Sequence, residues 1–178
     1  MSDYRFEHGD DPLLLTLSAP EAEALIDLAR STLAVVDSPF PAAGDEAVRS
    51  RLFPRAYLDP TEDAAEFAFQ ATVQSDMAQI RANAITAFIG EIDSGKHSRR
   101  GVEVSLDVDA AGRWIGVIND LRLTLGTRIG VSDSEDDLGH SEIVGVGQGD
   151  RAFYTWMTYL QEELIDRLAI YSPVDLKS

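Results

Sequence analysis

The sequence predicts a mainly α-helical fold, a compact four-helix domain with a small β-hairpin at its N-terminal end. Apolar residues recur at helical spacing over four long segments, whereas the alternation typical of strands is confined to short runs. The chain has 178 residues, of which 44% are hydrophobic, and this is enough for a single domain over residues 1–178 with its own core.

The hairpin is expected at the start of the chain. Residues 4–8 (YRFEH) alternate in polarity, residues 9–12 (GDDP) are typical of a turn, and residues 13–17 (LLLTL) form a second extended run. A helix should follow directly, because Ser18 and Glu21 have the spacing of a capping box.

The remaining elements are separated by segments rich in proline, glycine and acidic residues. The first helix should end within residues 37–45, and residues 48–63 are interpreted as a short apolar and basic connector. Three further helices are expected at about residues 62–92, 109–130 and 150–169. Residues 102–108 alternate and predict a strand or an extended lead-in, and residues 132–150 predict a surface loop.

The composition limits the classes of partner. The formal net charge is −16, which disfavours nucleic acid and anionic membranes as partners, and the basic cluster KHSRR at residues 96–100 is short. There is no cysteine, which excludes disulfides, thiolate metal sites and a cysteine nucleophile. No apolar run is long enough to span a bilayer and the first residues lack the features of a secretory signal, so a cytoplasmic location is expected.

Two segments are similar to functional motifs but depart from them. Residues 90–97 (GEIDSGKH) have the P-loop spacing, yet His97 stands where a hydroxyl residue should hold magnesium, and the segment closes a helix instead of opening one. Residues 133–142 are rich in carboxylates but lack the glycine and glutamate positions of an EF-hand loop. The histidines form no zinc-binding pair and no nucleophile-elbow motif is present, so the sequence predicts no catalytic residues, no cofactor and no defined metal site. A loose calcium or magnesium site at residues 133–142 stays open as an alternative to a solvated acidic loop.

The segment 114–131 (WIGVINDLRLTLGTRIGV) mixes charged and apolar side chains. On a helix its apolar residues cover well over half of the circumference, which is typical of a central, buried helix. The polar strip that is expected to face water consists of Gly116, Asp120, Thr124 and Thr127. Arg122 and Arg128 fall on the buried side, where a guanidinium needs a partner. The expected partners are the carboxylates Glu62, Asp63 and Glu66 of the long helix. The candidate cluster is therefore Asn119, Asp120, Arg122, Arg128 and Glu66.

The same segment carries a resemblance to a known family. Together with LFPRAY at residues 52–57 and AAEF at residues 64–67, it resembles an actinobacterial family of unknown function. The most specific part is Asn119-Asp120-Leu121-Arg122 followed by Leu125-Gly126-Thr127-Arg128. The resemblance covers nearly the whole chain and implies a small cytoplasmic protein that is often encoded beside the adaptor of the Clp protease. It implies no activity, although some members have been labelled transcriptional regulators.

These observations favour a non-enzymatic protein that binds a protein partner, or itself as a homodimer, in a setting linked to Clp-dependent proteolysis. Two alternatives stay open. Asn119, Arg122 and Arg128 could line a pocket for a small molecule or an anion, because arginine suits anion recognition. The basic cluster at residues 96–100 could serve a transcriptional regulator, which the net charge disfavours.

Overall fold

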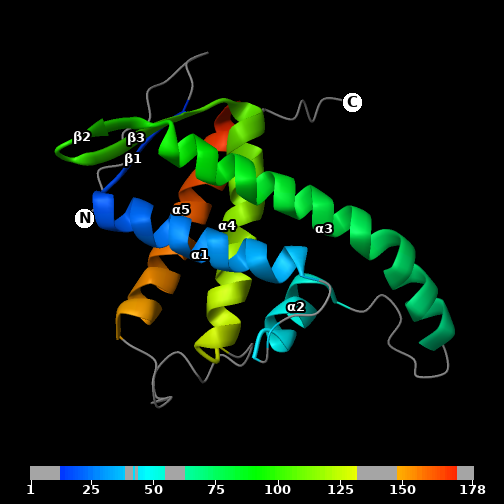
Figure 1. Ribbon diagram of the computed structural model, residues 1–178. Coiled ribbons are helices and arrows are strands. Elements are labelled where there is room, and N and C mark those ends of the chain that lie inside the picture. Colours follow the sequence, from blue (N-terminus) through cyan, green and yellow to red (C-terminus); the bar gives the residue numbers. More distant parts are fainter. Residues whose placement is uncertain (1–12, 39–41, 43, 55–62, 132–147, 172–178) are drawn as a thin grey trace.

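The computed structural model describes residues 13–38, 42, 44–54, 63–131 and 148–171, with side chains for all of these except 63–73, 170 and 171. The described residues form five helices and one three-stranded antiparallel sheet (Figure 1). A mainly α-helical fold is confirmed. The expected number of four helices is wrong, because an additional short helix lies within the segment that was interpreted as a connector.

The sheet links the start of the described chain to its middle. β1 (Leu13–Leu17) pairs antiparallel with β3 (Gly101–Leu106), and β3 pairs on its other side with β2 (Lys96–Ser98). Residues 13–17 form a strand as predicted, and their described partner lies about 90 residues later in the chain, while the predicted pairing with residues 4–8 stays a prediction. Residues 4–8, the expected partner, lie outside the described residues.

Burial explains why β1 and β3 pair in this register. Leu15 of β1 lies opposite Val104 of β3, and alternate residues of both strands are buried on one face. Gly101 begins β3 with a φ of +130°, and a Cβ atom there would lie 1.9 Å from the Leu17 carbonyl oxygen. Only glycine fits this close approach.

α1 (Ala19–Asp37) begins where the capping box predicts. Glu21 N donates to Ser18 Oγ at 3.4 Å, and Ser18 N donates to Glu21 Oε2 at 2.8 Å. The helix buries one face against the core through Ala22, Leu25, Ala29, Thr32, Val35 and Val36. This part of the sequence prediction is confirmed.

α2 (Glu46–Leu52) is the additional helix. It buries Val48 and Leu52, and Arg49 Nη1 donates to the carbonyl oxygens of Val35 at 3.0 Å and Ser38 at 2.8 Å. A basic side chain is thus placed at the C-terminal end of α1, where it complements the helix dipole. Seven residues are too few for a helical period to be recognised, and the contacts that stabilise α2 are made with a different helix.

The three long helices form the body of the bundle. α3 (Asp63–Asp93), α4 (Val108–Arg128) and α5 (Gln148–Tyr171) match the expected ranges to within two residues at each end. α4 contacts the four other helices and β3, and its Trp114 is fully buried against Phe88 of α3, so the prediction of a central helix is confirmed. Figure 1 shows α1 crossing α4, and the first part of α3 extending beyond the other helices. None of the described helices is long and apolar enough to cross a lipid bilayer.

Candidate functional site

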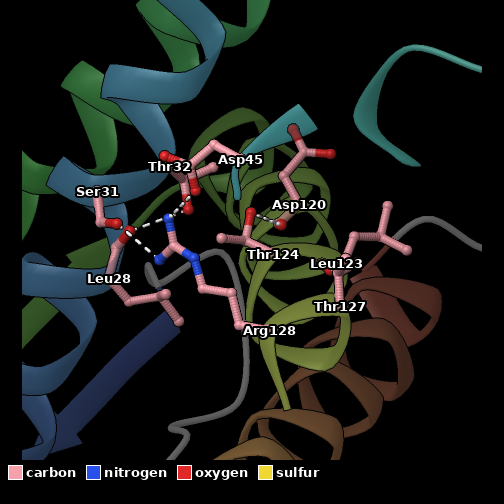
Figure 2. A network of polar contacts seen from close by, with 9 residues as sticks. All are labelled: Leu28, Ser31, Thr32, Asp45, Asp120, Leu123, Thr124, Thr127 and Arg128. Atoms are coloured by element: carbon pink, nitrogen blue, oxygen red, sulfur yellow. Dashed lines mark hydrogen bonds and ion pairs between the residues drawn. The ribbon is translucent and has the colours of Figure 1, made fainter. Parts of the chain in front are cut away.

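Arg128 extends from the last turn of α4 towards α1 (Figure 2). Its Nη1 donates to Ser31 Oγ at 2.7 Å, and its Nη2 lies 3.1 Å from Asp45 Oδ1, at the residue before α2. The side chain is 32% exposed, so this ion pair lies near the surface and not in the core as the helical projection predicted. The reason is position, because a long side chain in the last turn reaches past the end of the buried face.

Arg122 points to a different helix, α5. Its Nη1 donates to Gln161 Oε1, and Gln161 Nε2 in turn donates to the Ile115 carbonyl oxygen at 3.1 Å. The guanidinium carbon also lies 5.3 Å from the centre of the Tyr154 ring. A buried amide and an aromatic face therefore hold this arginine, where the sequence analysis expected a carboxylate.

The described contacts do not bring the predicted cluster together. Arg122 and Arg128 contact different helices, and Asn119 is exposed on α4. The side chains of Glu62, Asp63 and Glu66, which were the expected partners of these arginines, lie outside the described residues.

Asp120 contradicts the expectation that its strip of α4 faces water. The residue is 5% exposed, and Thr124 is fully buried below it. Thr124 Oγ1 donates to the Asp120 carbonyl oxygen at 2.9 Å, and Thr127 Oγ1 donates to the Leu123 carbonyl oxygen at 2.7 Å (Figure 2). Because its hydroxyl is satisfied within the helix, Thr124 can be buried beside Asp120 without losing hydrogen bonds, whereas Gly116 of the same strip is exposed as expected.

The Asp120 carboxylate forms an ion pair with Arg81 of α3 through its Oδ1. The Arg81 guanidinium carbon also lies 5.5 Å from the centre of the Phe53 ring, which packs against the core after α2. Burial raises the pKa of Asp120 above its ordinary value of 3.8, and the hydrogen bond and charge of Arg81 oppose this rise only in part. A buried tie between α3 and α4 thus exists, with the carboxylate on α4 and the arginine on α3.

A second polar tie joins the same two helices nearer the sheet. Glu91 of α3 accepts a hydrogen bond from Trp114 Nε1 at 2.6 Å through one oxygen and pairs with Arg113 through the other. As α3 runs from Arg81 to Glu91, its partners on α4 run back from Asp120 to Arg113, so the two helices are antiparallel here. The two ties lie about 10 Å apart along α4, from seven residues at 1.5 Å each.

A groove of about 580 Å³ lies between these two ties. It is partly open to solvent, and its lining includes Ala84, Ala87, Gly112 and Gly116, together with Arg81, Arg113 and Asp120 of the two ties. A Cβ atom added at Gly112 or at Gly116 would meet nothing within 4 Å. Ile80 also lines the groove and is 68% exposed although it is a large apolar residue. The volume lies in the range of ligand-binding pockets, and the floor is largely apolar.

Sequence reasoning found Asp120 but missed Arg81, Glu91 and Arg113. A signal for Arg81 was present, since it lies four residues after Met77 and four before Ile85, within the predicted apolar stripe of the long helix. A charge inside such a stripe requires a partner on the facing helix. The glycines carried no comparable signal, because only the neighbouring atoms show whether a glycine faces a helix or open space.

The other candidate sites that the sequence suggested do not contribute described residues to the groove. The P-loop-like residues 90–97 span the end of α3, a turn and the start of β2, and Lys96 lies 3.8 Å from Glu103 across the strand pair. The basic cluster at residues 96–100 therefore begins in an exposed edge strand. Residues 133–142 lie outside the described part of the chain.

Comparison with known proteins identifies a family without naming an activity. The model of the family described as "Domain of unknown function (DUF2017)" matches residues 3–168. No curated protein and no solved structure shows significant similarity to the chain. Because the match spans nearly all of its length, the chain belongs to the DUF2017 family.

Proposed function

We propose that this protein is a non-enzymatic binding protein that acts through contacts with other proteins, and that the α3–α4 groove is its binding surface. The observation that carries the proposal is the groove itself, which exposes small residues of two helices beside Ile80. An exposed apolar groove with a polar rim is a common feature of protein interaction sites.

The pairing of the charged groups supports binding over catalysis. Asp120 is held by Arg81, and Glu91 is held by both Arg113 and Trp114. A general acid or base must be able to reach a substrate proton, and these carboxylates are engaged with basic or N–H partners of the same chain. Fixed ion pairs at both ends of a groove are better suited to setting the register of a bound segment.

The test is isolation of the tagged full-length chain from its native cells, followed by reconstitution with the purified protein it recovers. We expect a stoichiometric complex that persists on size-exclusion chromatography. The adaptor of the Clp protease is the first partner to test in purified form. Members of the family that the sequence resembles are often encoded beside this adaptor. A chain that is recovered alone and that binds no candidate in reconstitution would contradict the proposal.

A second candidate function is binding of a small molecule. Asp120 favours it, because the carboxylate is almost fully buried, has a raised pKa and lines a groove of suitable volume. In this version the pocket lies between α3 and α4 at Asp120, and not at Asn119, Arg122 and Arg128 as the sequence predicted. It predicts that metabolite extracts raise the melting temperature of the wild type and leave that of Asp120→Asn unchanged.

A further inference from the structure

The groove is bordered by two helical stripes that no third helix covers among the described residues. On α3 the stripe runs through Met77, Ile80, Ala84 and Ala87, and on α4 it runs through Asp109, Gly112 and Gly116. Both have the alternating three- and four-residue spacing of helix-packing positions. Small residues let the backbone of another helix approach closely, and Met77 and Ile80 are 38% and 68% exposed beside them.

The charges around the groove are not balanced. Inside it, Arg81 and Arg113 are each paired with a carboxylate. Beyond its ends lie Asp76, one turn before Ile80, and Asp109, one turn before Gly112, and both are exposed. Neither carboxylate forms an ion pair within the described residues. Because α3 and α4 are antiparallel here, one of these acidic residues lies beyond each end of the groove.

We infer that the α3–α4 groove binds an amphipathic α-helix of a partner protein, with small apolar residues against the glycine and alanine floor and a basic residue near each end. This inference rests on the proposed function and names the class of partner. The span from Asp76 to Glu91 is about 22 Å along α3, which corresponds to a partner helix of about four turns. Basic residues near its two ends would face Asp76 and Asp109.

Charge argues against a second copy of this chain as the occupant. The chain carries a formal net charge of −16, and the ends of the groove are themselves acidic, so two copies would repel each other at this surface. A helix with basic residues near its ends instead meets, beyond each end of the groove, a carboxylate that is unpaired among the described residues.

The inference can be tested with a displayed library of helix-forming 16-residue peptides selected on the immobilised full-length chain. We expect enriched peptides to carry alanine, glycine or leucine at i, i+3, i+4 and i+7, with lysine or arginine near both ends. Synthesised peptides should bind Gly116→Leu at least tenfold more weakly than the wild type. They should bind Gly149→Leu with unchanged affinity, because a Cβ atom at Gly149 also meets nothing within 4 Å but Gly149 lies on α5 and does not line the groove.

The requirement for basic residues in the partner helix is tested with a second set of variants and its own control. Asp76→Asn combined with Asp109→Asn should weaken peptide binding several-fold and reduce its salt dependence, whereas Asp166→Asn on the exposed surface of α5 should not. No enrichment, enrichment of acidic peptides, or equal binding to Gly116→Leu would overturn the inference. A dimer of the full-length chain that is lost in Gly116→Leu would also overturn it, in favour of self-association. If a natural partner binds Gly116→Leu normally, the inference and the assignment of the groove as the binding surface both fail, while the proposal that the chain acts through contacts with other proteins stands.

Discussion

The two sides of α4 use glycine in opposite ways. Towards α5, Gly126 is buried, and a Cβ atom there would lie 3.1 Å from the Tyr154 ring. Towards α3, Gly112 and Gly116 are exposed, and a Cβ atom on either would meet nothing within 4 Å. One glycine therefore permits the close packing of α4 on α5, whereas the other two leave a surface open.

This difference separates residues that hold the fold from residues that are free to bind. Glycine inside a helix costs roughly 0.5–1 kcal/mol relative to alanine. At Gly126 the contact with Tyr154 gives a structural reason for that cost. At Gly112 and Gly116 no contact with the described residues requires glycine, so we attribute these two glycines to the binding of a partner.

The largest effect is expected from breaking the buried tie beneath the open side. Arg81→Leu should lower the free energy of unfolding by about 3 kcal/mol, because it leaves the buried Asp120 carboxylate without its cation. Urea denaturation measures this loss. Arg128→Leu is the control and should cost about 1 kcal/mol or less, because its ion pair with Asp45 is partly exposed. Equal losses in the two variants would show that Asp120 is not the critical buried charge.

The next effect separates the closed side from the open side directly. Gly126→Leu should lower the free energy of unfolding by about 2 kcal/mol, since the new side chain must displace Tyr154 from its place under Arg122. Gly116→Leu places the same side chain on the same helix but into the groove, and should not destabilise the fold. Thermal unfolding of the two variants compares them. Similar destabilisation by both would mean that the groove is not open space.

A smaller effect is expected from alanine at the open positions. Gly112→Ala and Gly116→Ala should each raise the free energy of unfolding by about 0.5–1 kcal/mol, because alanine restricts the unfolded chain and meets no atom in the folded one. Gly101→Ala is the opposite control, since its positive φ and its contact with the Leu17 carbonyl oxygen admit no Cβ atom. A loss of stability at Gly112 or Gly116 would contradict the geometry.

The smallest effect is expected in the pH dependence of the free energy of unfolding. Because the folded state raises the pKa of Asp120, the carboxyl group binds its proton more tightly in the folded chain than in the unfolded one. Its contribution to stability is complete below about pH 4, the unfolded value, and is lost as the pH rises through the folded value. In urea denaturation between pH 3.5 and 7, Asp120→Asn should therefore gain stability relative to the wild type as the pH increases. A constant difference would show that the pKa is not raised.

The sequence was sufficient for the parts of the fold that depend on local pattern. The capping box of Ser18 and Glu21 and the three long helices follow from residues close to one another in the chain. α2 and the β1–β3 pairing could not be predicted in the same way, because Arg49 and the strand partners act across long separations.

The candidate site was predictable only in part for the same reason. A helical projection places Asp120, Arg122 and Arg128 around α4, but it does not show which helix lies opposite each residue. It therefore assigned Asp120 to water, although Arg81 and the satisfied threonine hydroxyls allow its burial. The groove depends on empty space between two helices, which no property of either helix alone reveals.

The most direct test of the central claim measures stability and partner binding in one variant. The double variant Gly112→Ala/Gly116→Ala, with Gly149→Ala as its control, is compared with the wild type by thermal unfolding and by calorimetric titration with the partner recovered from cells. We predict that the double variant is more stable than the wild type yet binds the partner at least tenfold more weakly, whereas Gly149→Ala binds the partner normally. Unchanged partner affinity in the stabilised double variant would contradict the claim that the open side of α4 is the binding surface.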